Sequence, residues 1–217
     1  MQNRKKIFIV DDHPVFRKGL AQLIDEEEDL RVVGEAESVS QAVRRIEAVR
    51  PDLAIVDITL KDRSGMELIE YLRKNRPDLP VLVISMHDES LYAERVLRAG
   101  ALGYITKQEM TSDVVSAVRQ VLWGKRYLSA KMVDALLGKM VTGGNVEGGN
   151  PVHVLTNREL EVFQLIGRGF KRSEIADMLS LSVKTIGTYN ENIKKKMNLK
   201  SASELVKYAV TWIETNQ

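Results

Sequence analysis

Short apolar runs alternate with stretches of helical periodicity along the first part of the chain. The runs are 6–10, 30–36, 53–57, 80–85 and 102–105. Between them, apolar residues recur at spacings of three and four, as in amphipathic helices. Five strands that are each followed by a helix require parallel crossover connections. The pattern therefore predicts an α/β fold, a doubly wound five-stranded parallel sheet of the flavodoxin-like kind.

The pattern changes after a glycine-rich stretch, 142–151, which has four glycines within seven residues and predicts a flexible tether. Beyond it the periodicity predicts an all-α unit of four helices, in which a short helix, a tight turn and a second helix form a helix-turn-helix. We therefore divide the chain into a first domain, 1–124, a linker with a short helix, 125–150, and a second domain, 151–217.

Composition restricts the class of protein. Apolar residues make up 44% and charged residues 29%, as in ordinary globular proteins. The chain has no cysteine, which excludes disulfides and thiolate metal sites and fits a reducing compartment. The apolar run behind the basic start ends at Asp11, too early for a signal peptide or a membrane span. We expect a cytoplasmic protein with no membrane partner.

Charge is distributed unequally. Residues 1–149 hold 22 Lys and Arg against 23 Asp and Glu, whereas residues 150–217 hold 10 against 7. The segment 184–200 has five lysines and one acid, Glu191. A basic module behind a near-neutral one indicates a polyanion partner. A solvated helix face is the alternative interpretation.

Polar side chains follow several of the predicted strands: Asp11, Asp12, Asp57, Ser85 and Lys107. In this fold the carboxyl ends of the strands meet at one edge. Two carboxylates about 4 Å apart repel by roughly 4 kcal/mol at an effective dielectric of 20, so three of them require a cation. An all-oxygen site with open positions suits Mg²⁺.

A lysine and a hydroxyl beside such an ion supply the parts that bind a phosphoryl group. Asp57 can then act as the nucleophile that forms an acyl phosphate. Each residue also has a structural explanation: Asp11 and Asp12 as a helix cap, Ser85 as a turn residue, Lys107 as a surface lysine.

These motifs resemble the receiver domain of two-component response regulators over residues 6–123. The matching residues are Asp-Asp-His-Pro-Val-Phe-Arg-Lys-Gly-Leu (11–20), Asp57, Ser-Met-His (85–87) and Ala-Leu-Gly-Tyr-Ile-Thr-Lys (101–107). The resemblance implies that Asp57 takes a phosphoryl group from a phosphohistidine on a sensor histidine kinase.

The resemblance also implies a role for each residue of the site. Mg²⁺ would bind Asp12 and Asp57 directly, Asp11 through water, and the carbonyl of Thr59. Lys107 would hold a phosphoryl oxygen. Ser85 and Tyr104 would form a switch pair, the hydroxyl moving toward the phosphate and the ring turning inward. Tyr104 as an ordinary core or surface aromatic is the alternative.

The third helix of the second domain, from Val183 to about Met197, has two faces. Val183, Ile186, Ile193 and Met197 are expected to point inward. We assign DNA contacts to the rest of the helix: Lys184, Thr185, Gly187, Thr188, Glu191, Lys194 and Lys195. Lysines, including Lys196, would neutralise phosphates, Thr188 can touch a thymine methyl or a base edge, and Glu191 can accept from cytosine.

This segment resembles the LuxR/FixJ-type DNA-binding domain over residues 155–209. The matching residues include Leu-Thr-x-Arg-Glu-x-Glu-Val (155–162), Glu-Ile-Ala (174–176) and Ser-Val-Lys-Thr-Ile (182–186). It departs from the pattern at Gly187, Tyr189 and Asn190, so the target sequence cannot be taken from relatives. The resemblance implies dimerisation through the last helix, where an apolar strip comprises Leu205, Ala209, Trp212 and Ile213. Core packing against the first helix is the alternative role of that strip.

Together these features predict a NarL/FixJ-type response regulator that is not an enzyme. Phosphorylation would switch a transcription regulator that dimerises and binds double-stranded promoter DNA. A dehalogenase-like phosphatase is one alternative, but it would need a second aspartate where Thr59 stands. A regulator that acts through protein contacts, having weak or no DNA recognition, is the other, motivated by Gly187 and Asn190.

Overall fold

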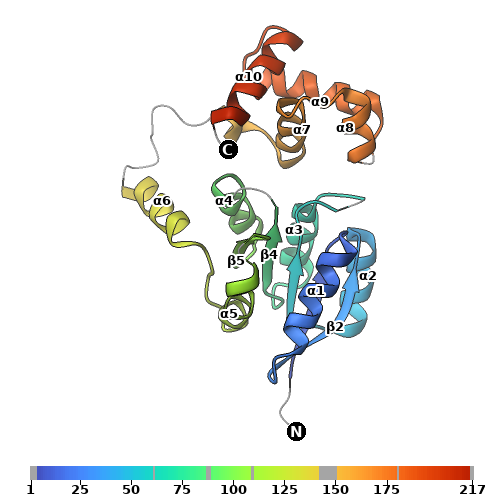
Figure 1. The fold of residues 1–217 in the computed structure, drawn as a ribbon, viewed down its shortest axis with the longest axis vertical. Helices are drawn as coiled ribbons and strands as arrows, with labels where there is room; N and C mark the ends of the chain where they lie inside the picture. Colours follow the sequence, from blue (N-terminus) through green and yellow to red (C-terminus); the bar gives the residue numbers. More distant parts are fainter. Residues whose placement is uncertain are drawn as a thin grey trace. The chain divides into compact units, whose positions relative to one another are not determined.

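The structure, a computed structural model, describes residues 4–60, 62–86, 89–108, 110–141, 151–179 and 181–215 (Figure 1). The chain divides into two compact units, 1–141 and 142–217, and each is described here by itself. The stretch 142–150, expected to be a tether, lies outside the described residues.

The first unit is built on a parallel sheet with the strand order β2-β1-β3-β4-β5. The strands are β1 (Lys5–Val10), β2 (Leu30–Ala36), β3 (Leu53–Val56), β4 (Val81–Ser85) and β5 (Gly103–Thr106). The order reverses direction at β1, so the carboxyl ends of β1 and β3 flank a crevice of the kind that binds ligands in such sheets. The predicted doubly wound five-stranded sheet is confirmed.

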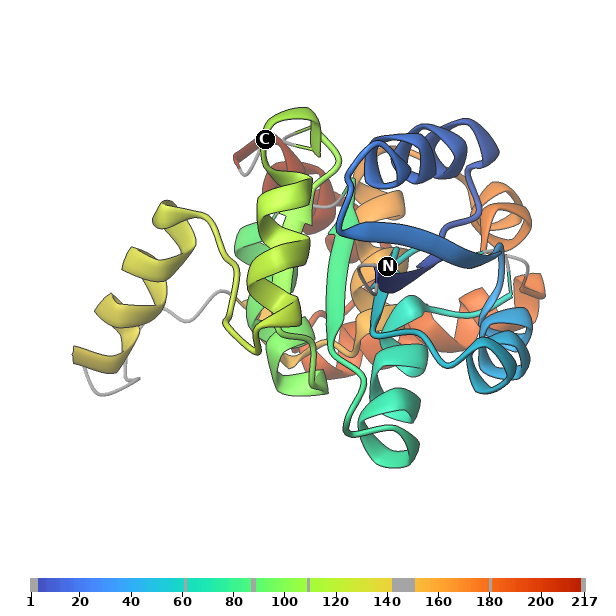
Figure 2. The ribbon, with the colours of Figure 1, turned by 90° about the horizontal axis from the view of Figure 1, so that it is seen from below.

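Helices cover both faces of this sheet (Figures 1 and 2). They are α1 (Pro14–Asp25), α2 (Val39–Val49), α3 (Gly65–Asn75), α4 (Glu89–Ala99) and α5 (Met110–Leu122). Side chains alternate along each strand, so Ile7 and Ile9 face the side on which Leu20 of α1 and Val118 of α5 complete one buried cluster. The opposite side of the sheet is covered by α2, α3 and α4. Burial on both faces explains why the strands are continuous apolar runs.

The segment after α5 continues the first unit. Tyr127 pairs with the edge of β5, because its N–H donates to Leu102 O (3.0 Å) and its carbonyl accepts from Tyr104 N–H (2.9 Å). Ser129 then caps α6 (Ala130–Val141), accepting from Met132 N–H at 3.2 Å. Ser129 also donates to Glu89 at the start of α4, through its N–H and its hydroxyl.

The second unit has the four helices predicted, preceded by a short 3₁₀ turn. Its elements are η1 (Pro151–Val154), α7 (Asn157–Gly167), α8 (Arg172–Met178), α9 (Val183–Lys196) and α10 (Ala202–Thr215). Thr156 opens α7 with the expected capping box, in which it accepts from Glu159 N–H (3.3 Å) and Glu159 accepts from Thr156 N–H (2.7 Å). The ring of Phe163 packs edge-on against that of Trp212, with centroids 5.6 Å apart. This contact fixes α7 against α10.

Candidate functional site: the acidic pocket and the α9 face

Two carboxylates and one ammonium group meet at the carboxyl edge of the sheet. Lys107 Nζ lies 2.6 Å from Asp11 Oδ2 and 2.7 Å from Asp57 Oδ2. All three are buried: Asp11 is 2% exposed, Asp57 3%, and the side chain of Lys107 4%. The structure therefore brings together three residues that are 46 and 50 positions apart in the sequence, as the strand-end argument predicted.

The hydrogen-bond ladder of the sheet positions these residues. It extends one residue beyond β1, β3 and β5. Asp11 N–H donates to Ala36 O (3.0 Å), Asp57 N–H to Val10 O (2.8 Å) and Lys107 N–H to Ser85 O (2.8 Å). Gly65 opens α3 directly against this turn, and a Cβ there would lie 1.9 Å from Asp57 O. Only glycine lets the backbone approach so closely.

The electrostatics of the pocket follow from burial. Burial raises the pKa of Asp57 from its ordinary 3.8 to about 6, and the ammonium of Lys107 opposes that rise. Burial also favours the neutral form of Lys107, but the Asp57 and Asp11 carboxylates outweigh it and raise its pKa. Lys107 is therefore a fixed positive charge, whereas Asp57 is poised to change charge.

Asp12 and His13 extend the acidic pocket toward solvent. Ligand atoms of Asp11, Asp12, His13 and Asp57 all lie within 4.8 Å of one another. Asp12 Oδ1 is buried and accepts no hydrogen bond, although His13 Nδ1 lies 2.8 Å away. The arrangement is suited to a cation. His13 was treated in the sequence only as the residue that opens α1, and its position directly after two acids is the signal that could have indicated it.

Further residues line the pocket. Lys107 Nζ lies 4.2 Å from the centre of the Phe16 ring, a cation–π contact that the sequence did not reveal. Thr59 N–H donates to Asp57 Oδ1 at 3.3 Å. Ser85 ends β4 and is fully buried, and the side chain of Tyr104 in β5 is buried as well, a position that suits both the switch role and the core aromatic raised as its alternative.

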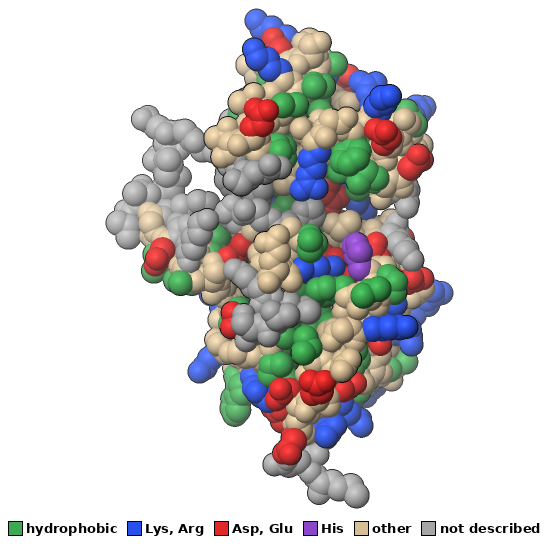
Figure 3. All heavy atoms as spheres, viewed as in Figure 1, with side chains coloured by type: hydrophobic (Ala, Val, Ile, Leu, Met, Phe, Trp, Pro, Cys, Tyr) green, Lys and Arg blue, Asp and Glu red, His purple; other side chains and the backbone are tan. Residues whose placement is uncertain are grey.

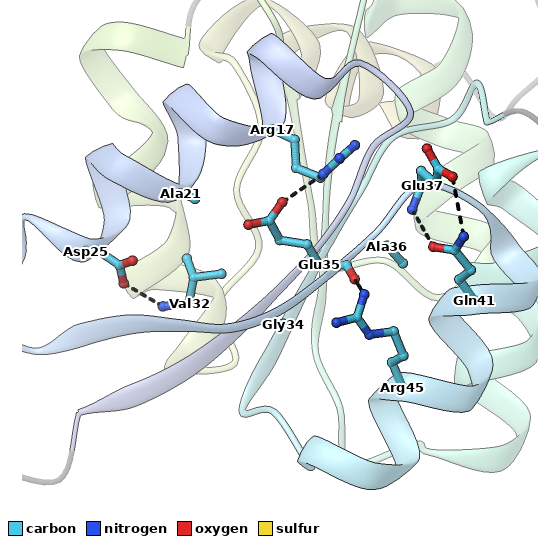
Figure 4. A pocket seen from close by; sticks show the side chains of 10 residues that line it. All are labelled: Arg17, Ala21, Asp25, Val32, Gly34, Glu35, Ala36, Glu37, Gln41 and Arg45. Atoms are coloured by element: carbon cyan, nitrogen blue, oxygen red, sulfur yellow. Dashed lines mark hydrogen bonds and ion pairs between the residues drawn. The ribbon is translucent and has the colours of Figure 1, made fainter.

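A second hollow lies on the outer edge of β2, between α1 and α2 (Figure 4). Its polar groups are already paired: Asp25 accepts from Val32 N–H (2.7 Å), and Arg45 donates to Glu35 O (2.5 Å). Arg17 donates to the Glu35 carboxylate at 2.8 Å. Asp25 and Arg45 thus bind the backbone of an edge strand, which protects it from pairing with another chain. We therefore assign a structural role to the residues that line this hollow.

In the second unit, α9 presents the expected polar face. Lys184, Thr188, Glu191 and Lys195 are exposed, and Thr185 and Gly187 are partly exposed. Lys194 is less available for a contact with DNA, because its Nζ pairs with the Glu191 carboxylate at 2.9 Å. On the side of both units seen in Figure 3, Lys and Arg side chains are interspersed with Asp and Glu.

Some expectations for α9 need correction. Ile186 and Ile193 are fully buried as predicted, but Val183 is 52% exposed, because it occupies the first turn, ahead of the contacts with α7 and α8. Lys196 binds the Glu159 carboxylate (2.6 Å) and so is engaged within the unit. Asn190 is buried. With its side-chain amide in the orientation that satisfies both neighbours, the NH₂ group donates to Ile186 O (3.2 Å) and the oxygen accepts from Arg172 Nε (3.1 Å).

The apolar strip on α10 packs inward. Leu205, Ala209 and Trp212 are buried, and α10 contacts α7 extensively. A Cβ on Gly167 of α7 would lie 2.6 Å from Ile213 Cγ1. Core packing, the alternative raised for this strip, is what the structure shows. Val206, on another side of α10, is exposed.

An acidic pocket at the carboxyl edge of a 2-1-3-4-5 sheet, followed by a helix-turn-helix unit, defines a two-component response regulator with a LuxR-type DNA-binding domain. Residues 7–119 match the family model of the response regulator receiver domain, and residues 153–209 match that of the bacterial regulatory proteins of the luxR family. The chain belongs to this family, whose members are transcription regulators rather than enzymes.

Particular relatives span nearly the whole chain. The oxygen regulatory protein NreC of Staphylococcus carnosus (strain TM300) is 37% identical over 209 residues, 94% of this chain and 96% of the relative. RcsB from Salmonella enterica serovar Typhimurium, solved on promoter rprA with the phosphomimetic BeF₃⁻, is 26% identical, covers 96% of this chain and 99% of its own, and has a TM-score of 0.63. A structure of two RcsB dimers on two parallel DNAs is 26% identical, with 95% and 98% coverage and a TM-score of 0.58.

None of the helices in the described part of the chain has the length and apolar character that a membrane crossing requires.

Proposed function

We propose that Asp57 accepts a phosphoryl group from a sensor histidine kinase and that this modification controls DNA binding by α9. The observation that carries the proposal is the position of Lys107 Nζ, 2.6 Å from Asp11 and 2.7 Å from Asp57. A buried lysine between two carboxylates supplies a positive charge where a phosphoryl group would arrive. No comparable arrangement is needed for folding, since buried ion pairs stabilise proteins little.

Mg²⁺ is the cofactor we propose for this pocket. The buried Oδ1 of Asp12 accepts no hydrogen bond, and a cation would satisfy it. Asp12 and Asp57 would bind the ion directly, Asp11 through water, and the Thr59 carbonyl would complete the protein ligands. Carboxylate and carbonyl oxygens are the ligands Mg²⁺ prefers. When bound, the ion would neutralise charge on the phosphoryl oxygens.

The chemistry assigned to the chain's own residues is a single displacement. A carboxylate oxygen of Asp57 attacks the phosphorus of a phosphohistidine, the new O–P bond forms as the N–P bond breaks, and the imidazole leaves. The product is an acyl phosphate. Lys107 Nζ, freed from Asp57 Oδ2, then holds a phosphoryl oxygen. We further propose that Ser85 and Tyr104 form a switch pair, in which the Ser85 hydroxyl moves to donate a hydrogen bond to the phosphate and the Tyr104 ring turns inward to the position that it occupies in this structure.

The proposed target of the switch is double-stranded promoter DNA. The exposed residues of α9 would enter the major groove, with Lys184 and Lys195 against phosphates and Thr188 and Glu191 toward base edges. RcsB has been solved bound to promoter DNA and as dimers on DNA, which supports the same role and a phosphorylated homodimer here. A regulator of this kind would act in the cytoplasm.

The test is DNA binding with and without a small phosphodonor. A duplex is selected from a randomised pool by the wild-type chain, and its Kd is measured with Mg²⁺ in the presence and absence of acetyl phosphate. We expect acetyl phosphate to tighten wild-type binding at least about tenfold, a coupling of about 1.4 kcal/mol. Asp57→Asn should bind equally in both conditions.

Asp62→Asn is the matched control. Asp62 lies five residues after Asp57, but its carboxylate accepts from Val39 N–H (2.9 Å) and Ser40 N–H (3.0 Å), away from the pocket. It should respond to acetyl phosphate as the wild type does. Equal affinities of the wild type with and without the phosphodonor would contradict the switch. If the wild type selects no duplex from the pool, that result would favour a regulator that acts through protein contacts.

A further inference from the structure

We infer that Phe16 is a positioning residue for phosphoryl transfer, because the face of its ring keeps the Lys107 ammonium in the pocket while that ammonium moves from Asp57 to the phosphoryl group. The inference rests on the proposed phosphorylation of Asp57. It adds to that reaction a residue that carries no charge and no polar group of its own.

The contact between Phe16 and Lys107 lies inside the acidic pocket. Lys107 Nζ is placed over the Phe16 ring, 4.2 Å from its centre. The Lys107 side chain is almost completely buried, so little water competes with the ring for the ammonium. Cation–π contacts are strongest when they are desolvated in this way. The ring is therefore a third partner of the ammonium, besides the carboxylates of Asp11 and Asp57.

Two hydrogen bonds to Asp11 fix the turn that carries Phe16. His13 N–H donates to Asp11 Oδ1 at 2.8 Å, and Arg17 Nη1 donates to Asp11 O at 2.6 Å. Phe16 lies between these two residues in the first turn of α1, which Pro14 opens. The strand end that supplies one carboxylate of the pocket thus also holds the aromatic ring in place.

The ring and the carboxylates restrain the ammonium differently. The hydrogen bonds to Asp11 and Asp57 depend on distance and angle. The attraction of a cation to an aromatic face is broader, and it acts up to about 6 Å from the ring centre. Lys107 Nζ can therefore leave Asp57 Oδ2 and still be attracted by the Phe16 ring.

Such a partner is needed at the moment of transfer. When the Asp57 oxygen forms its bond to phosphorus, it gives up the negative charge that lies 2.7 Å from Lys107 Nζ. A lysine side chain that loses a partner regains conformational freedom. The ring limits that freedom and keeps the ammonium where negative charge develops on the phosphoryl oxygens. Phe16 should therefore accelerate formation of the acyl phosphate.

Phe16 also packs against the buried apolar cluster on the α1 side of the sheet. Packing depends on the volume and shape of the side chain, whereas cation–π attraction depends on the negative face of the ring. Fluorine withdraws electron density from that face and changes the shape of the ring little. Fluorination therefore separates the positioning role from packing.

The test measures the rate at which Asp57 is phosphorylated in the full chain. Phosphoramidate, a small donor with an N–P bond, is added with Mg²⁺, and intact-protein mass spectrometry follows the acyl phosphate over time. Mono-, di- and trifluorophenylalanine are incorporated at position 16. We expect the rate to fall with each added fluorine, to about a tenth of the wild-type rate for the trifluoro variant. Phe16→Leu, which keeps an apolar side chain but has no ring, should be slowed at least as much.

Phe8 provides the matched control. It lies in β1, the strand that ends just before Asp11, but its side chain alternates with that of Ile9 and so faces the other side of the sheet. There it packs against Gly34 of β2, where a Cβ would lie 2.6 Å from Phe8 Cε2. Trifluorophenylalanine at position 8 should leave the phosphorylation rate unchanged. Circular dichroism checks that each variant is folded.

Equal rates across the fluorinated series at position 16 would overturn the inference, even if Phe16→Leu were slow, because Phe16 would then act by packing alone. Equal slowing by fluorination at position 8 would also overturn it. A wild-type chain that forms no acyl phosphate at Asp57 would remove the proposed phosphorylation and this inference together. A phosphorylated wild type with either of the first two results would remove the inference alone.

Discussion

The acidic pocket and the exposed face of α9 are two polar regions of very different construction. Asp11, Asp57 and Lys107 come from three strand ends and are buried, and both carboxylates lie within 2.7 Å of Lys107 Nζ. The α9 residues come from one stretch of 14 residues, and their side chains point largely to solvent. The sheet therefore determines the pocket, whereas the α9 face is open to solvent. Substitutions in the pocket should consequently change the stability of the first unit, whereas substitutions on the exposed face of α9 should change DNA recognition.

Removal of the pocket's cation should have the largest effect on stability. Lys107→Met leaves the buried carboxylates of Asp11 and Asp57 without their cation, which should lower the free energy of unfolding at pH 8 by about 3 kcal/mol or more in EDTA. Urea unfolding followed by circular dichroism measures this loss. Mg²⁺ should restore much of it, because an ion that binds only the native state stabilises that state.

Lys18→Met provides the comparison for that experiment. Lys18 is an exposed residue of α1, so its replacement should change stability by no more than about 0.5 kcal/mol. Equal effects of the two substitutions would mean that the pocket does not differ energetically from the surface.

The pH dependence of stability should reveal the raised pKa of Asp57. The folded-state pKa of about 6 is above the ordinary 3.8, so between these values the native state holds a proton that the unfolded chain has released. Stability must then fall as pH rises from about 4 to 6. Relative to Asp57→Asn, the wild type in EDTA should lose up to about 3 kcal/mol across this window. Parallel pH profiles for the two proteins would contradict the shift.

Two glycines of the second unit should respond oppositely to alanine. Gly167→Ala places a Cβ 2.5 Å from Ala209 O and should destabilise the unit by about 1–3 kcal/mol. Gly187→Ala should stabilise it by about 1 kcal/mol. Urea unfolding followed by the fluorescence of Trp212, which is buried against Phe163, distinguishes them. Stabilisation by Gly167→Ala would show that α7 and α10 are packed less closely than described.

The pocket was predictable from the sequence because strand ends obey topology. Once five βα units are recognised, Asp11, Asp57 and Lys107 must share one edge of the sheet. His13 and Phe16 were missed, because their roles depend on how the first turn of α1 leans over that edge. The spacing of apolar residues in a helix does not predict the angle between that helix and the sheet.

The second unit shows where periodicity stops being informative. It correctly separated Ile186 and Ile193 from the exposed residues of α9. It could not anticipate that Lys196 reaches the capping box of α7, or that Asn190 turns inward to Arg172. Both depend on the crossing of α9 with neighbouring helices. For α10, the same apolar strip suited a dimer or the core, and the packing of Gly167 against Ala209 shows the core contact that periodicity alone could not indicate.

Chemical mapping of the phosphoryl group shows directly whether Asp57 is the phosphorylated residue. The wild-type chain is treated with acetyl phosphate and Mg²⁺, reduced with borohydride so that an acyl phosphate of aspartate becomes homoserine, and analysed by peptide mass spectrometry. We expect homoserine at position 57 of the wild type and none in Asp57→Asn. A label on a different residue, or none in the wild type, would contradict it.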